Sequence, residues 1–93
     1  MIIGSIVFDI YIPYAGSLKE KRMVVRSVKE KLKSKFNVSV SEIGDLDKWQ
    51  YAQVAVVTVA PDKKQVEKVI QNIINFVENN YPDIHINVYK ELI

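Results

Sequence analysis

The chain has no cysteine and only one histidine among its 93 residues. Without cysteine it can have no disulfide framework, no thiolate nucleophile and no cysteine-based zinc site. This absence is typical of a reducing compartment, and we expect a cytoplasmic protein. The one histidine, His85, stands among polar residues of a predicted strand, with no nucleophile beside it in the pattern. We therefore predict no catalytic residue and no enzyme activity.

Glycine is scarce, and Gly4, Gly16 and Gly44 are isolated from one another. The chain therefore has no glycine-rich phosphate loop. An acidic turn, Asp45-Leu46-Asp47 with Glu42 upstream, lacks the number and spacing of ligands that a calcium loop needs. The sequence therefore predicts neither a metal nor another cofactor, and no site for a small-molecule substrate can be recognised in it.

Long hydrophobic runs are also missing, although apolar residues make up 48% of the chain. No run approaches the roughly 20 residues that a membrane-spanning helix requires. The first apolar run contains Asp9 and is not preceded by a basic region, so we do not expect a signal peptide. We expect no membrane partner.

What the chain does have is a long amphipathic segment, from Ser17 to Phe36. Ser17 and Glu20 have the spacing of a capping box, which favours the start of a helix at this point. Apolar residues then recur at steps of three, four and seven, which predicts one buried helix face. These residues are Leu18, Val25, Val28, Leu32 and Phe36.

The same segment holds most of the positive charge. It has eight basic residues and two acids, a net charge of +6, whereas the whole chain is +2, so the other residues sum to −4. Two interpretations stay open: a solvated helix face, or a surface that binds phosphates. We expect Lys21, Lys31 and Lys35 to flank the buried face. The candidate nucleic-acid-binding residues are Lys19, Arg22, Arg26, Lys29 and Lys33.

The rest of the chain reads as four strands and a second helix capped by Asp62. The order β-α-β-β-α-β predicts an α+β, ferredoxin-like sandwich in one domain, residues 1–93. Its sheet would be antiparallel with order 4-1-3-2, and both helices would cover one face. The first and third strands are the most apolar, as central strands should be. The expected ranges are Ile2–Ile12, Asn37–Ile43, Trp49–Ala60 and Ile84–Tyr89 for the strands, and Lys63–Asn79 for the second helix.

The sheet face away from the helices is predicted to be partly apolar. Ile3, Val7 and Tyr11 fall on it, but the pattern does not decide which side of the third strand does. A contiguous apolar patch of this kind needs a cover, and we expect a homodimer. Tyrosines on this face could instead stack on bases, although residues 50–60 do not match the RNP1 pattern of RRM domains. We expect Trp49 to anchor the acidic turn in the core. The candidate interface residues are Ile3, Val7, Tyr11, Val57 and Tyr89.

Three segments together resemble the YlxP family of small bacterial proteins of unknown function. They are Ser17-Leu18-Lys19-Glu20-Lys21-Arg22, Phe36-Asn37-Val38-Ser39-Val40-Ser41-Glu42 and Trp49-Gln50. The resemblance implies a bacterial cytoplasmic protein with a ferredoxin-like fold and no known catalytic residues. It also implies genes that often lie beside translation-initiation and ribosome-maturation genes.

Two hypotheses for function follow. The first is a non-enzymatic protein associated with RNA or ribosomal particles through the basic helix face, although the net charge of +2 is low for an RNA binder. The second is a homo-oligomeric protein-interaction module without a nucleic-acid role.

Overall fold

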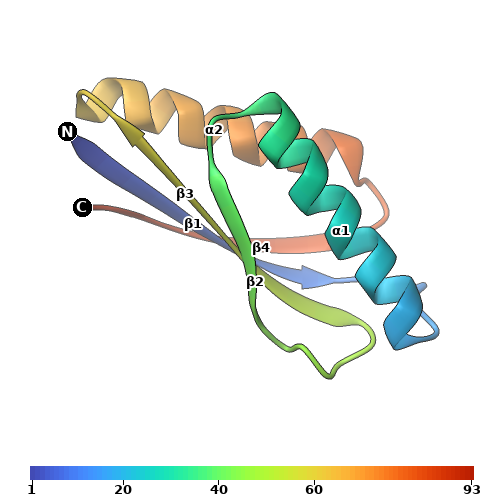
Figure 1. Cartoon of the computed structure of the whole chain (residues 1–93). Helices are drawn as coiled ribbons and strands as arrows, with labels where there is room; N and C mark the ends of the chain where they lie inside the picture. Colours follow the sequence, from blue (N-terminus) through green and yellow to red (C-terminus); the bar gives the residue numbers. More distant parts are fainter.

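A computed structural model describes residues 1–93 and shows two helices against one face of a twisted four-stranded sheet (Figure 1). The strand order is β2-β3-β1-β4 with every neighbour antiparallel, which is the predicted order 4-1-3-2 read from the other edge. The ferredoxin-like βαββαβ fold is therefore confirmed. In chain order the elements are β1 (Ile2–Tyr11), α1 (Leu18–Lys35), β2 (Ser39–Gly44), β3 (Tyr51–Ala60), α2 (Lys63–Asn80) and β4 (His85–Leu92).

Side chains cap both helices at the predicted residues. The Ser17 hydroxyl accepts a hydrogen bond from the Glu20 amide at 3.1 Å, and the Asp62 carboxylate accepts one from the Gln65 amide at 2.9 Å. The Glu20 carboxylate accepts from the Gly16 amide at 2.7 Å, one residue before the position expected for a capping box. Each cap satisfies amide groups that the first turn leaves without a helical partner. Neither helix has a stretch apolar enough to span a membrane.

All four strands differ from the predicted bounds by one to three residues at one or both ends; β1 ends at Tyr11, one residue early, and β2 runs from Ser39 to Gly44 and not from Asn37 to Ile43. β3 begins at Tyr51 and not at Trp49, because the residues before it belong to the loop from β2. β4 continues to Leu92, beyond the predicted end at Tyr89, because it pairs with β1 as far as Gly4. Antiparallel pairing with a central strand supplies backbone partners that the local sequence pattern does not reveal.

The core lies between the sheet and the helices. Alternate residues of β1 and β3 point into it, among them Phe8 and Val54, and the apolar stripe of each helix closes it. Gly4 lies on the same side, where a Cβ atom would come within 2.7 Å of Val66, so α2 approaches β1 more closely than a larger residue would allow. The inward residues of β3 are Ala52, Val54, Val56 and Thr58.

The burial of these four residues settles the phase of β3, which the sequence left open. Tyr51, Ala55, Val57 and Val59 therefore lie on the opposite side of the sheet, which we call the open face. They join the outward residues of β1 there.

Candidate functional site

The five candidate phosphate-binding residues form one row along α1, which we call the basic stripe: Lys19, Arg22, Arg26, Lys29 and Lys33. They recur at steps of three and four residues, so they follow one side of the helix for about 21 Å. Lys29 is half-buried and the other four are exposed. The opposite side of α1 is buried against the sheet through Val25, Val28 and Leu32.

No carboxylate lies within ion-pair distance of any residue of the basic stripe. The protein has three ion pairs, and none of them includes these five side chains. The other cations of α1 are used differently: Lys31 lies over the ring of Tyr81 and Lys35 over the ring of Phe76. The basic stripe is therefore an uncompensated row of positive charge.

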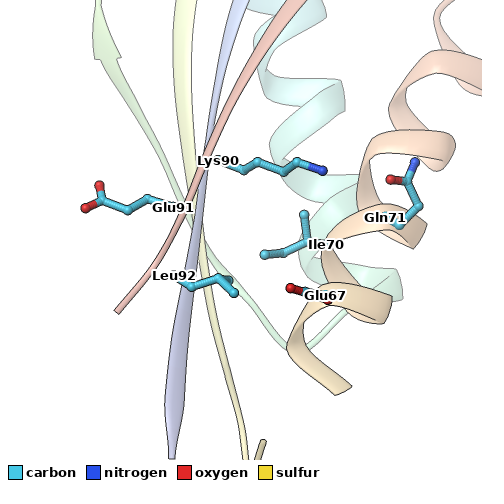
Figure 2. Close-up of a pocket in the computed structure, with 6 residues that line it drawn as sticks. All are labelled: Glu67, Ile70, Gln71, Lys90, Glu91 and Leu92. Atoms are coloured by element: carbon cyan, nitrogen blue, oxygen red, sulfur yellow. The ribbon is translucent and has the colours of Figure 1, made fainter. Parts of the chain in front are cut away.

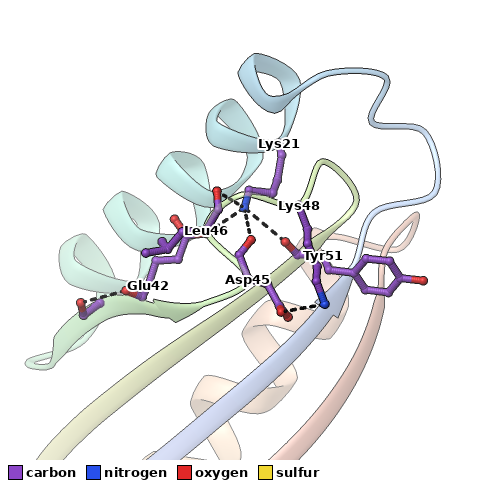
Figure 3. A network of polar contacts seen from close by, with 7 residues as sticks. Lys21, Glu42, Asp45, Leu46, Lys48 and Tyr51 are labelled. Atoms are coloured by element: carbon purple, nitrogen blue, oxygen red, sulfur yellow. Dashed lines mark hydrogen bonds and ion pairs between the residues drawn. The ribbon is translucent and has the colours of Figure 1, made fainter.

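Lys21 does not flank the buried face as predicted; it is part of that face, and its side chain is 1% exposed. Its ammonium group donates to the backbone carbonyls of Asp45, Leu46 and Tyr51 at 2.8, 3.3 and 3.2 Å (Figure 3). It also pairs with Oε2 of Glu42 at 3.1 Å, and that oxygen is buried and has no other partner. We call this arrangement the Lys21 cluster. A buried ammonium group is tolerated here because four oxygen atoms surround it.

The Lys21 cluster has the anchoring role that was predicted for Trp49. That residue is 58% exposed and does not anchor the turn in the core. The turn is held from inside by Lys21 and from the β1–α1 loop, where the Gln50 side-chain amide donates to the Pro13 carbonyl at 2.9 Å. Trp49 is thus presented outward on a fixed loop. The three segments that carry the family resemblance meet at this point.

The sequence contained an indication that Lys21 is buried. Leu18, Val25, Val28 and Leu32 follow the three-four spacing of a buried stripe, and Lys21 occupies the one position of that spacing without an apolar residue. Nothing local shows that Glu42 and three carbonyl groups would meet it there, because they lie 21 to 30 residues further along the chain.

The five candidate interface residues all lie on the open face. The strand registers arrange this face in rows that cross β3, β1 and β4. One row is aromatic, the next is polar, and the following ones are mostly apolar. From one end of the face to the other, the rows are Tyr51–Tyr11–His85, Gln53–Asp9–Asn87, Ala55–Val7–Tyr89, Val57–Ser5–Glu91 and Val59–Ile3, and Ile93 pairs with Ile3.

The aromatic row is stacked on itself. The ring centres of Tyr11 and Tyr51 are 5.0 Å apart, those of Tyr11 and His85 are 5.7 Å apart, and both ring pairs are close to parallel. Lys48 also lies over the ring of Tyr51, 5.8 Å from its centre. The rings of this row stack mostly on one another, so mainly their edges are accessible to a ligand. An RRM domain instead presents flat aromatic faces to the bases.

A hollow lies between α2 and the edge strand β4 (Figure 2). Glu67 and Lys90 carry opposite charges across it, while Ile70 and Leu92 form its apolar part. Glu91 points to the other side of the strand (Figure 2). No nucleophile converges here with a base, and we assign this hollow no function.

Comparisons with known proteins identify the family. The chain is 41% identical over 70 residues to the uncharacterized protein YlxP of Bacillus subtilis (strain 168), a match that covers 75% of each chain. Among solved structures it is similar to a putative PII-like signaling protein from Thermus thermophilus, with a TM-score of 0.48 and 20% identity over 98% of this chain and 86% of the other. Residues 3–90 match the family described as Protein of unknown function (DUF503). This chain, with its βαββαβ fold and its basic first helix, belongs to that family.

Proposed function

We propose that this protein is a non-enzymatic, RNA-associated protein that holds RNA phosphates on the basic stripe of α1. The observation that carries the proposal is the absence of any carboxylate within ion-pair distance of Lys19, Arg22, Arg26, Lys29 or Lys33. Solvated lysine-rich helices are commonly balanced by acids three or four residues away. Here the Glu20 carboxylate accepts a hydrogen bond from the Gly16 amide, and neither Glu20 nor Glu30 forms an ion pair.

The distribution of charge supports binding through this one surface. The segment from Ser17 to Phe36 has a net charge of +6 and the other residues sum to −4. A polyanion is therefore attracted to α1 and repelled from much of the remaining surface. Such contacts read no base sequence, so we expect similar affinities for unrelated RNAs of equal length.

Salt dependence tests the proposal. If four cations of the basic stripe contact phosphates, log K should fall against log salt with a slope of about −3 for single-stranded RNA. Between 50 and 200 mM salt, this slope corresponds to roughly 50-fold weaker binding. Fluorescence anisotropy with several unrelated labelled RNAs measures the slope, and co-sedimentation at low salt asks whether ribosomal particles bind too. Undetectable RNA binding at low salt would leave the stripe as a solvated helix face.

A second candidate function rests on the open face: a module that self-associates through its sheet. Val59 is 56% exposed and Tyr89 is 58% exposed, and Glu91 is the one charged side chain in the three rows from Ala55–Val7–Tyr89 to Val59–Ile3. The entire face measures about 20 Å by about 30 Å, or roughly 600 Å² per copy. Two copies would bury about 1,200 Å², the lower end for specific complexes. We therefore propose a weak homodimer, which is compatible with RNA binding because α1 lies on the other side of the sheet.

Light scattering across micromolar concentrations should show a mass that rises above 10.7 kDa. Val57→Asp should restore the monomer without unfolding the chain, because Val57 is exposed at the centre of the apolar rows. Asn72→Asp on α2 is the matched control, since it adds the same charge at an exposed position away from the open face. A monomer at every concentration would remove this candidate.

A further inference from the structure

Trp49 is the only tryptophan of the chain, and it lies outside the core on a loop that is held from within. Tryptophan is usually well buried, because its large ring gains much from leaving water. This ring makes no stacking contact with another aromatic ring, and no cation lies over it. The residue is 58% exposed, so much of the indole ring is accessible, in contrast to the stacked rings of Tyr11 and Tyr51.

The side chain of Trp49 borders an open hollow between the β2–β3 loop and the β1–α1 loop. The hollow is shallow and wide open to solvent, so it presents a surface for contact and does not enclose a ligand. Ala15 and Gly16 form the opposite wall, so small residues leave space beside the indole ring. Lys48 also lines the hollow, and its ammonium group is paired with Asp45 at 3.3 Å.

This hollow lies at the beginning of the basic stripe. Gly16 directly precedes Ser17, the N-cap of α1, and Lys19 lies in the first turn of that helix. Of the acids nearby, Glu42 pairs with Lys21 and Asp45 pairs with Lys48 at 3.3 Å, whereas Asp47 is exposed and forms no ion pair. The positive charge that attracts an anionic ligand to Trp49 therefore comes from the start of the basic stripe, not from the loop itself.

We propose that Trp49 stacks on one unpaired base of a single-stranded RNA whose phosphates lie along the basic stripe from Lys19 onward. The inference rests on the proposed function and adds a preference for single strands. A free aromatic face beside a row of cations is the arrangement by which proteins bind single strands without reading their sequence. In a duplex the bases are stacked on each other, so Trp49 cannot stack on any of them.

The intrinsic fluorescence of Trp49 tests the inference, since no other tryptophan contributes. We expect a short oligouridylate to quench this fluorescence, and an RNA duplex of the same length to leave it unchanged. Trp49→Ala should weaken oligouridylate binding about tenfold or more, the size expected for one stacked base, and should not alter duplex binding. Trp49→Phe keeps a stacking ring and should retain most of the affinity. The indole is exposed, so both variants should fold, which circular dichroism checks.

The outcomes separate this inference from the proposed function. If anisotropy shows RNA binding, but the fluorescence is not quenched and the parent and Trp49→Ala bind equally well, the proposed role of Trp49 is wrong. The proposed function of the basic stripe is then unaffected. Trp49 would then be free to serve as an anchor for a protein partner. No binding of either RNA at low salt overturns both. Quenching by the oligouridylate together with a selective loss in Trp49→Ala supports both.

Discussion

Replacement of Lys21 by Met is expected to lower the free energy of unfolding by about 3–5 kcal/mol, the usual loss when one partner of a buried ion pair is removed. Methionine preserves much of the aliphatic stem but removes the ammonium group. Glu42 then keeps a buried carboxylate oxygen whose partner is gone, and three backbone carbonyls lose the Lys21 donor, although the Asp45 carbonyl still accepts from the Lys48 amide at 3.0 Å. Because small domains are stable by only about 5–15 kcal/mol, this loss is a large share of the total.

Urea denaturation measures the effect, and Lys48→Met is its control. The Lys48–Asp45 pair is exposed, so its removal should cost about 1 kcal/mol or less. A double variant, Lys21→Met with Glu42→Leu, should recover part of the stability, since it replaces both charges by apolar groups. A Lys21→Met protein as stable as the Lys48→Met control would show that the Lys21 cluster is not a structural anchor.

A triple change on the basic stripe, Arg22, Arg26 and Lys29 each to Glu, is expected to abolish RNA binding. Three phosphate contacts are lost and three repulsive charges replace them on the same side of α1. Each contact contributes through counterion release, so affinity should fall by more than about 100-fold at low salt. Folding should be nearly unaffected, because Arg22 and Arg26 are exposed, Lys29 is only half-buried, and none of the three forms an ion pair.

The matched control is the triple change of Lys63, Lys64 and Lys68 to Glu on α2. It shifts the net charge by the same six units, and all three side chains are exposed. If RNA binds along α1, the control should retain most of its affinity in the same anisotropy titration. If both variants lose RNA affinity equally, binding depends on total charge, and the basic stripe is not a specific RNA-binding site.

The fold follows from patterns that are visible along the chain. Two edge strands with alternating apolar residues, two capped amphipathic helices and two strongly apolar central strands allow few arrangements other than the ferredoxin-like one. Ser17 and Asp62 mark the helix starts through local hydrogen bonds, which depend only on residues within three positions. The basic stripe was recognisable for the same reason, since its residues repeat at steps of three and four along one helix.

The phase of β3, the burial of Lys21 and the exposure of Trp49 depend on contacts between distant parts of the chain. A strand that is apolar on both sides has no periodic signal to orient it, so Val56 enters the core and Val57 the open face through pairing with β1. Lys21 is buried because chain segments 21 to 30 residues away bring oxygen atoms to it, and no local pattern encodes that meeting. Once Lys21 holds the turn, Trp49 is not needed as its anchor and is left facing solvent.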